Sequence, residues 1–254
     1  MSKKPVKGMK ISEHIYLVGS GCMGLSPEGD CNVYALADGG DIYLVDCGFH
    51  EDPGGLLRNM EQDGLECANL RGVLLTHIHP DHAGAVPAFQ KMGIPILGCE
   101  ESARVLAQGI EAYYRLRERL PPSGFRDYFC QPVRGRVSRV LRPGERSAFG
   151  GCTVEMVPTP GHSPDSVCYL MRCGEKTHLF TGDTLFYQGQ VSYFTNVLSC
   201  TDCYPGTIAA LAALRPEGLY PGHLLFSVTR GWVSTERAKA YLEAGVLPPI
   251  KKYS

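Results

Sequence analysis

Three histidines and one aspartate fall within six consecutive residues of this 254-residue chain, in the stretch HIHPDH from His77 to His82. The whole sequence has only 8 histidines, so this concentration is unusual. Imidazole nitrogens and carboxylate oxygens are the groups that bind zinc and similar divalent cations. Because His77 and His79 are two residues apart, their side chains point the same way on an extended chain. The pattern therefore indicates a metal site.

Pro80 turns the chain inside this motif, so we expect Asp81 and His82 to face a neighbouring ion. Two ions need more ligands than one segment can supply. The missing ligands are expected at the ends of other strands, where loops hold polar groups on a rigid frame. Glycine near such a residue lets the backbone approach a ligand closely. Residues that follow an apolar run in this way are Asp46, His162, Asp183 and His223.

Each of these residues, taken alone, has a simpler interpretation. A histidine after a strand is more often a surface or hydrogen-bonded residue than a ligand. An aspartate in a GDT sequence, such as Asp183, is commonly a turn residue or a helix cap. The order of the segments around HIHPDH favours ligands instead. Asp46 has the weakest case, because its VDCG sequence could simply end a strand.

The five segments resemble the motifs of the metallo-beta-lactamase superfamily, in the order that this superfamily uses. The resemblance extends from Ile11 to His223 and implies a metal-dependent hydrolase. The fold that it implies is α/β, an αββα four-layer sandwich with the metals at one edge. The ligand sets that it implies are His77, His79 and His162 for one zinc ion and Asp81, His82 and His223 for the other.

The resemblance also implies that Asp183 bridges the two zinc ions, with a water or hydroxide between them, and that Asp46 orients ligands through hydrogen bonds. Two such ions lower the pKa of a shared water and give hydroxide near neutral pH. The hydroxide would attack an acyl carbon or a phosphorus, and the ions would stabilise the oxyanion. Asp81 and Asp183 are the expected catalytic residues. Imidazole and carboxylate also suit iron and manganese, so the metal stays open.

The segments FTGDTLF and PGHSPDS look most like the glyoxalase II branch, whose substrates are thioesters of glutathione. That branch has a C-terminal helical domain for glutathione, and only Lys251 and Lys252 could replace its basic residues here. The size and the insertion are also similar to acyl-homoserine lactonases, which place a tyrosine three residues after the bridging aspartate. Phe186 holds that position, so Tyr187 and Tyr193 are the candidates for substrate contact. We expect an ester, thioester or lactone hydrolase with a small-molecule acyl substrate.

Three other activities of the same fold stay open. A phosphodiesterase or ribonuclease would need a basic groove, and its only support is the arginine-rich segment with RLRER and RGRVSR. A persulfide dioxygenase would use one iron and the same histidines, but YQGQVSYF lacks the Gly-Cys-Gly-Arg-type segment usual there. A flavin-linked di-iron protein replaces the second histidine of the motif with glutamate, and His79 argues against it. A non-enzymatic descendant would have lost ligands, and none is missing.

The composition limits the kinds of binding partner that the protein is expected to have. The net charge of −1 favours neither nucleic acid nor a membrane surface as a partner. No apolar run approaches the length that crosses a bilayer, and no apolar segment follows the basic N-terminus. We therefore expect a cytoplasmic protein without nucleic-acid or membrane partners. The oligomeric state stays open, with a homodimer as one option.

The sequence has 11 cysteines, most of them single residues in apolar segments, where a thiol behaves as a small hydrophobic group. In the reducing cytosol we expect them to remain unpaired. One pair, Cys200 and Cys203, has the CxxC spacing. No second pair has that spacing, so we interpret this pair as incidental, with a metal or redox role as the alternative.

Periodicity predicts strands followed by helices, twice along the chain. The stretch 38–40 is the turn of a β-hairpin. We expect one domain over residues 1–254 with a helical insertion near residues 100–145. That insertion reads as one helix over 100–120, broken at Pro121, and then an irregular segment over 123–142. Strands are expected at 14–19, 32–37, 41–48, 72–79, 95–99, 152–159, 166–172, 177–183 and 218–223, and further helices at 56–65, 83–93, 206–214 and 234–245.

Overall fold

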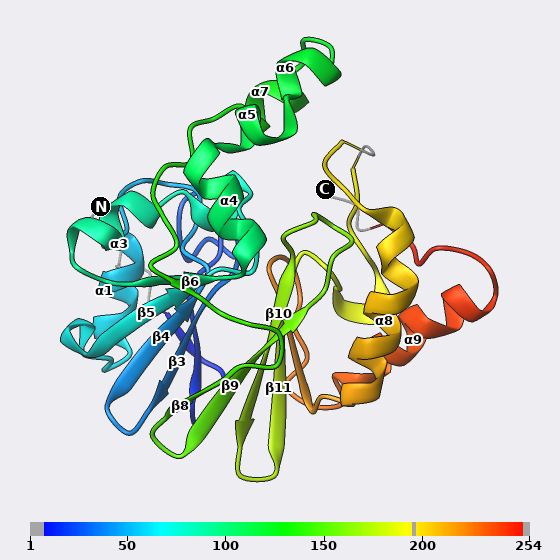
Figure 1. Cartoon of the computed structure of the whole chain (residues 1–254). Helices are drawn as coiled ribbons and strands as arrows, with labels where there is room; N and C mark the ends of the chain where they lie inside the picture. Colours follow the sequence, from blue (N-terminus) through cyan, green and yellow to red (C-terminus); the bar gives the residue numbers. More distant parts are fainter. Residues whose placement is uncertain (1–7, 195–196, 251–254) are drawn as a thin grey trace.

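Two β-sheets pack face to face in the structure, and helices cover the outer surface of each sheet (Figure 1). The computed structural model describes residues 8–194 and 197–250 of the chain. Within these residues, one sheet has the strand order β1-β2-β3-β4-β5-β6-β7 and the other has the order β12-β11-β10-β9-β8. This is the αββα sandwich that the sequence predicts.

The first sheet changes from antiparallel to parallel at its centre. Neighbouring strands from β1 to β4 are antiparallel, and those from β4 to β7 are parallel. The predicted hairpin turn joins β3 to β4. The strands are β1 (Met9–Lys10), β2 (Ile15–Gly19), β3 (Val33–Asp38), β4 (Asp41–Val45), β5 (Leu70–Leu74), β6 (Ile96–Gly98) and β7 (Arg139–Val140).

The second sheet is antiparallel except at one edge, where β12 pairs with β11 in parallel. That parallel pair brings the carboxyl ends of both strands to the same side of the sheet. The strands are β8 (Arg146–Phe149), β9 (Cys152–Pro158), β10 (Val167–Cys173), β11 (Lys176–Gly182) and β12 (Gly218–Pro221).

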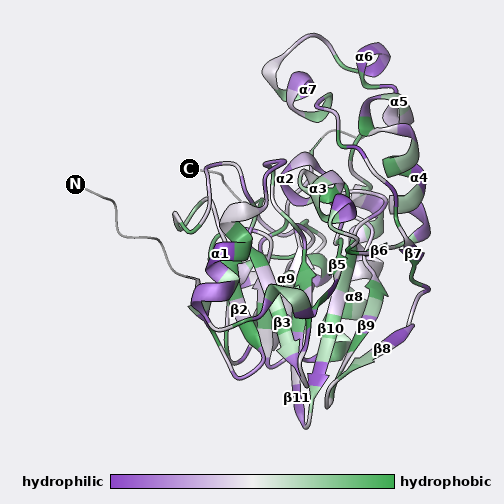
Figure 2. Cartoon of the chain, turned by 90° about the vertical axis from the view of Figure 1, so that its left-hand side faces the viewer, coloured by the Kyte–Doolittle hydropathy of each residue, from purple (hydrophilic) through white to green (hydrophobic). Residues whose placement is uncertain are grey.

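Apolar residues on both faces of the strands make three layers of core. In β2, Ile15 and Leu17 pack between the two sheets, whereas Tyr16 and Val18 pack under the helices of the first sheet. This alternation follows from the two-residue period of a strand. A third cluster packs β10 and β11 against the helices of the second sheet. Figure 2 accordingly shows β2, β3 and β10 as largely hydrophobic.

Helices α1 (Gly54–Gln62) and α3 (Val86–Lys91) lie against the first sheet, and α8 (Tyr204–Leu214) and α9 (Trp232–Glu243) cover the second (Figure 1). The one-turn helix α2 (Pro80–Ala83) begins inside the HIHPDH motif. Pro80 occupies its first position, where a missing backbone N–H does no harm. The short 3₁₀ helices are η1 (Cys67–Asn69), η2 (Tyr187–Gly189) and η3 (Thr201–Cys203).

The insertion differs from the single helix predicted over residues 100–120. It forms α4 (Glu100–Gln108), α5 (Ile110–Tyr114) and α6 (Leu116–Arg119). The helix breaks at Gly109 and at Arg115, both of which have positive φ. A further helix, α7 (Gly124–Phe129), lies in the segment predicted to be irregular, and the Ser123 hydroxyl caps it by accepting from the N–H of Arg126. The helices α5, α6 and α7 project at the top of Figure 1, and α4 lies below them.

Two cysteine pairs contradict the expectation of unpaired thiols. Cys152 and Cys173 face each other on β9 and β10 and form a disulfide. The Cys200–Cys203 pair, interpreted from the sequence as incidental, also forms a disulfide. The two cysteines of the first pair are 21 residues apart in the sequence. The sequence pattern does not predict their pairing, because it depends on the register between the two strands. In the described part of the chain, no helix is long and apolar enough to cross a membrane.

Candidate metal centre

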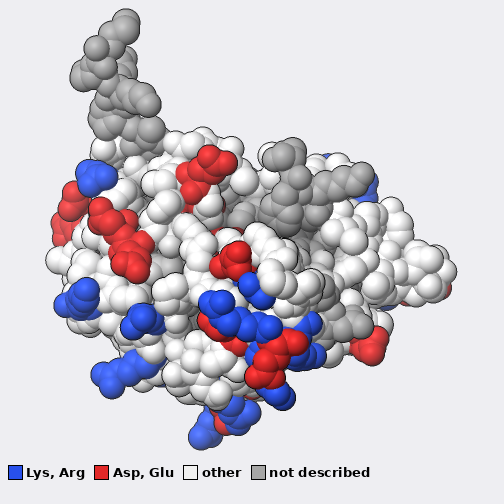
Figure 3. Space-filling model, turned by 90° about the horizontal axis from the view of Figure 1, so that it is seen from above, with Lys and Arg blue, Asp and Glu red and all other residues white. Residues whose placement is uncertain are grey.

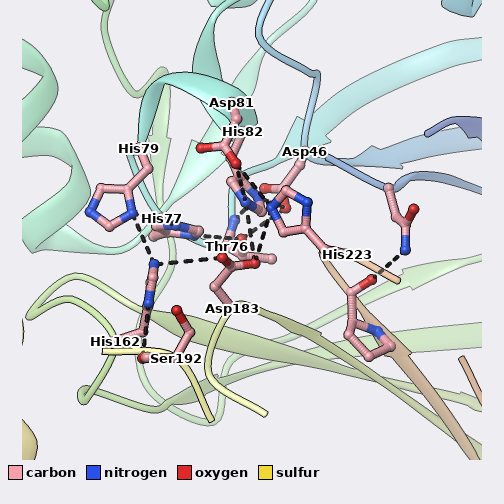
Figure 4. A network of polar contacts seen from close by, with 12 residues as sticks. Asp46, Thr76, His77, His79, Asp81, His82, His162, Asp183, Ser192 and His223 are labelled. Carbon is pink, nitrogen blue, oxygen red and sulfur yellow. Dashed lines mark hydrogen bonds and ion pairs between the residues drawn. The ribbon is translucent and has the colours of Figure 1, made fainter. Parts of the chain in front are cut away.

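The predicted site residues come together at one edge of the sandwich (Figure 4). Each follows the carboxyl end of a strand, Asp81 and His82 in the one-turn helix α2 and the others in loops, and the strands belong to both sheets. The strands and the residues that follow them are β4 with Asp46, β5 with His77, His79, Asp81 and His82, β9 with His162, β11 with Asp183, and β12 with His223.

His77, His79 and His162, here called the histidine trio, point one ring nitrogen each into a common space. The Nδ1 atom of His79 lies 3.0 Å from Nε2 of His77 and 2.9 Å from Nε2 of His162. All three side chains are buried. The trio thus unites two residues of one loop with a histidine 83 positions along the chain.

The outer nitrogens of the trio show which atoms carry protons. Nδ1 of His162 lies 3.0 Å from the carbonyl oxygen of Ser192, so this nitrogen must donate. Nδ1 of His77 lies 3.0 Å from the Thr76 hydroxyl, whose own hydrogen is donated to Asp46. The Nε2 atoms of both histidines therefore direct lone pairs into the common space. A single proton on His79 cannot fully serve both lone pairs, whereas a cation can.

Burial keeps the histidine trio uncharged. Desolvation lowers the pKa of His77 and His79 well below the usual value, and the neighbouring imidazoles lower it further. Burial also lowers the pKa of His162 to about 4. The three imidazoles are therefore neutral at physiological pH, which is the form that binds a metal ion.

Asp81, His82, Asp183 and His223, here called the carboxylate-rich group, form the adjoining half of the site. Nε2 of His223 lies 2.9 Å from Oδ2 of Asp81 and 3.5 Å from Oδ1 of Asp183. Nε2 of His82 lies 3.5 Å and 3.4 Å from the same two oxygens. These four atoms converge as the trio does, but two of them belong to carboxylates.

Charge sets the protonation of this second half. Burial alone would raise the pKa of Asp81, but His82 and His223 outweigh it and hold that pKa below its usual range. Burial disfavours the charged form of His223, yet Asp183 and Asp81 raise its pKa. The pKa of His82 is also raised against burial, by Cys31 and by the carboxylates around it. In this half, the attraction between imidazoles and carboxylates therefore outweighs the effect of burial.

Asp183 lies between the two halves. Its Oδ1 faces His82 and His223, and its Oδ2 lies 3.8 Å from Nε2 of His162 in the histidine trio. Gly222 makes this approach possible, because a Cβ atom there would lie 2.6 Å from both Asp183 Oδ1 and the ring of His82. Steric exclusion therefore explains why the residue before His223 is a glycine.

Asp46 connects the two halves of the site through hydrogen bonds. Its Oδ2 accepts hydrogen bonds from Nδ1 of His82 and from the hydroxyl of Thr76, both at 2.8 Å. The same hydroxyl contacts His77, so one carboxylate orients an imidazole in each half. Asp46 has a φ of 62°, which a non-glycine residue rarely adopts and which turns its carboxylate toward the site.

Asp165 holds the loops of the site and was not identified from the sequence. Its Oδ2 accepts from the backbone N–H of Ile78, between the two histidines of HIH, and from the hydroxyl of Ser102 in α4. Its Oδ1 accepts from Ser163, next to His162. The carboxylate therefore ties the insertion to both loops of the histidine trio. Its position in the PGHSPDS segment was the available signal.

A cleft of about 630 Å³ opens above both halves. Tyr128 of the insertion reaches into it, and its hydroxyl donates to Oδ1 of Asp81 at 2.7 Å. The sequence analysis missed Tyr128 and the phenylalanines around it, although FRDYF places aromatic residues at helical spacing. The lining residues include His79, Asp81, Asp183 and His223 from the metal centre, and Phe125, Tyr128, Phe129 and Phe194.

Comparison with known proteins identifies the family. Residues 26–223, most of the chain, match the family model described as the Metallo-beta-lactamase superfamily. The chain belongs to the metallo-beta-lactamase superfamily. The expected family is therefore confirmed.

Among solved structures, a metallo-beta-lactamase family protein of Thermus thermophilus superposes with a TM-score of 0.74. It is 23% identical, and the alignment covers 92% of this chain and 81% of that one, which supports the shared fold. A hydroxyacylglutathione hydrolase of Hahella chejuensis is 30% identical over 60% of this chain and 46% of its own length. An atrochrysone carboxyl ACP thioesterase of Passalora fulva is 26% identical over 88% and 57%. The chain spans about half the length of these curated relatives.

The residues of this metallo-beta-lactamase fold suit divalent cations. Ligand atoms of the histidine trio lie within 4.8 Å of one another, and so do those of Asp81, His82 and His223. The Nε2 atom of His82 is buried and makes no hydrogen bond within the described residues. When this nitrogen gives up its proton, its lone pair faces two carboxylates, an arrangement that a cation completes.

The two tyrosines expected near the substrate lie elsewhere. Tyr187 is 38% exposed and lines a different depression, with Arg230 and Arg237. Tyr193 packs against the third core cluster, under the helices of the second sheet. Neither is among the described residues that line the cleft. Lys251 and Lys252 lie outside the described residues.

Proposed function

We propose that this metallo-beta-lactamase-fold hydrolase cleaves an ester, thioester or lactone and uses about two zinc ions per chain. The observation that carries the proposal is the pair of adjoining ligand sets that share Asp183. The names of two relatives, a hydroxyacylglutathione hydrolase and an acyl-carrier-protein thioesterase, support an acyl substrate. Zinc is proposed because imidazole nitrogens together with one or two carboxylates are common zinc ligands.

The histidine trio would hold one ion, and Asp81, His82 and His223 would hold the other, with Asp183 between them. When bound, two such ions supply Lewis acidity and an activated water. The protein's own part is to hold the imidazoles in fixed tautomers through Ser192, Thr76 and Asp46. The cleft then presents the acyl carbon of the substrate to this preorganised centre.

The arginines of the insertion do not support the phosphodiesterase alternative. Four arginines of its helical part pair with neighbouring carboxylates, Arg139 of the RGRVSR segment pairs with Glu145, and Figure 3 shows basic and acidic side chains intermixed on the face that carries the site. A basic groove would need unpaired cations of one sign. The pairs are Arg104 with Glu100, Arg115 with Glu118, Arg117 with Glu111, and Arg126 with Asp127.

The test combines metal analysis of the purified protein with a substrate panel. The panel contains S-lactoylglutathione, a homoserine lactone, an aryl ester and bis-nitrophenyl phosphate. We expect about two metal ions per chain, turnover of at least one acyl substrate, and loss of turnover after chelation that zinc restores. Turnover of the phosphodiester alone would overturn the proposed reaction class. One equivalent of iron, with no zinc-dependent turnover, would favour the dioxygenase.

A further inference from the structure

Three phenylalanines form one side of the cleft. Phe125 and Phe129 come from α7 of the insertion, and Phe194 comes from the loop after η2. Their ring centroids are 5.0 to 5.4 Å apart. The ring of Phe129 meets the rings of Phe125 and Phe194 edge to face, and the rings of Phe125 and Phe194 are tilted against each other. We call these three residues the aromatic wall. Two segments that are distant in the sequence thus build one apolar surface.

The aromatic wall adjoins the histidine trio rather than the carboxylate-rich group. The ring of Phe129 lies 4.8 Å from that of His79, and the ring of Phe194 lies 5.2 Å from that of His162. Phe129 is almost completely buried and supports the others, whereas Phe125 is 37% exposed. An apolar group bound at Phe125 and Phe194 would therefore lie next to the reacting centre.

The charged residues along the cleft are acidic. Glu28 and Asp30 line it together with the carboxylates of the metal centre, and no Lys or Arg is among the described lining residues. Asp30 accepts from the N–H of Phe49 at 2.7 Å, which fixes its carboxylate in place. Arg126, the arginine of α7, pairs with Asp127. An anionic group beside the aromatic wall would find no Lys or Arg side chain among the described lining residues to offset its desolvation.

We propose that the enzyme selects acyl substrates whose acyl group carries an uncharged aromatic ring, which binds against the aromatic wall. This inference rests on the proposed hydrolase function. A ring gains more than area burial from edge and face contacts with Phe125 and Phe194. The cleft volume of about 630 Å³ is in the range that encloses a small organic ligand. Phe125 and Phe194 are then specificity-determining residues.

The experiment uses zinc-loaded protein and thioesters of one neutral thiol, N-acetylcysteamine, with four acyl groups. These are acetyl, 3-phenylpropionyl, 3-cyclohexylpropionyl and succinyl. Because the leaving group is constant, kcat/KM reports on the acyl group alone. We expect 3-phenylpropionyl to exceed succinyl by roughly 100-fold and cyclohexylpropionyl by a few-fold, as expected for pocket contacts of this size.

Two variants connect this preference to the wall. Phe125→Ala should lower kcat/KM for 3-phenylpropionyl about tenfold, mainly through KM, and lower kcat/KM for the acetyl thioester much less, because acetyl has no ring to contact the wall. Phe125→Leu, which keeps the bulk, should lose the preference for phenyl over cyclohexyl. The matched control is Tyr241→Ala, since Tyr241 is a similarly exposed aromatic residue on α9, at 40%. It should change neither value.

A charge variant tests the acidic rim. Glu28→Lys should raise kcat/KM for the succinyl thioester several-fold and leave the phenylpropionyl thioester nearly unchanged. Glu175→Lys is its control, because Glu175 is an exposed carboxylate in the turn between β10 and β11. Equal effects of the two lysine variants would contradict a role for the rim.

Binding of an uncleavable ketone separates the two proposals. We would compare 4-phenyl-2-butanone with the anionic ketone levulinate by ligand-observed NMR. One outcome is that the phenyl ketone binds, that Phe125→Ala weakens this binding about tenfold, and that no thioester is cleaved. This outcome would uphold the aromatic wall and reject the hydrolase. Turnover without preference for the phenyl group, or a Phe125→Ala effect no larger than that of Tyr241→Ala, would reject the inference and retain the hydrolase. Neither binding nor turnover would reject both.

Discussion

The histidine trio and the carboxylate-rich group adjoin each other, and HIHPDH supplies two residues to each, yet they differ in charge. The trio consists of three imidazoles whose pKa burial lowers, so it is neutral without a metal. The carboxylate-rich group contains Asp81 and Asp183, which raise the pKa of His223 against the effect of burial. A metal ion that binds the histidine trio therefore displaces few protons, whereas one that binds the carboxylate-rich group competes with protons on His82 and His223.

The surroundings of each half explain this contrast. Phe129 and Phe194 pack against the trio and exclude water from it, so desolvation dominates. Around His82, the carboxylates of Asp46, Asp81 and Asp183 gather within hydrogen-bonding or ion-pairing distance, so electrostatics dominate. One sequence motif can therefore supply two different metal environments. In each of them, tertiary contacts decide whether burial or charge sets the pKa of the histidines.

The largest expected effect is that of Asp183→Ala, which removes the residue shared by both halves. We expect the variant to lose most of its bound metal and to lose activity by about 1,000-fold or more, because a ligand and a shared charge disappear together. Metal analysis after dialysis and assay with the best substrate measure both quantities. Glu175→Ala, at an exposed turn, is the control. An Asp183→Ala variant that keeps both ions would disprove the bridging role.

Acidification should separate the two halves and remove about one ion per chain. Protonation of His162 begins only near its lowered pKa of about 4, so the trio keeps its ligands neutral well below pH 6.5. The pKa of His82 and of His223 is raised, so protons already compete with metal there near neutral pH. As pH falls from 7.5 to 5, the carboxylate-rich group should release its ion first.

Equilibrium dialysis at stepwise pH, followed by metal analysis, would measure this order. Replacing zinc with cobalt makes the two environments distinguishable by their absorption spectra. Release of both ions in a single step, or earlier release from the trio, would contradict the predicted difference between the halves.

The smallest expected effect is that of Tyr128→Phe, which removes one hydroxyl from the edge of the carboxylate-rich group. Loss of its hydrogen bond to Asp81 should weaken metal binding in that half about tenfold, while the trio is unchanged. The ring itself should remain, because it stacks on Phe49. Tyr113→Phe is the matched control, since the Tyr113 hydroxyl bonds to Glu101 within the insertion. Equal weakening in both halves would show that the change acts through folding instead.

Much of the fold follows from local patterns in the sequence. The alternating apolar residues of β2 and β3 and the turn between β3 and β4 are visible without a structure. The insertion is less predictable, because its helical period continues through Gly109 and Arg115, where backbone conformations with positive φ divide the helix into three. Likewise, the short helix α7, which Ser123 caps, lies in a segment that reads as irregular.

The sequence by itself determined the family, the sandwich and the set of candidate ligands, because residue type, order and proximity to strand ends are all local properties. Tertiary structure alone decided which side chains share a space. Tyr128 and Phe194 contact the site from segments with no recognisable motif, and Asp165 holds its loops although only its place beside His162 in the sequence suggests it. Tyr187 and Tyr193 are not among the described residues that line the cleft, despite their favourable position in the sequence. The physical reason is that burial and charge at a metal centre are sums over neighbours that the chain brings together only when both sheets have packed.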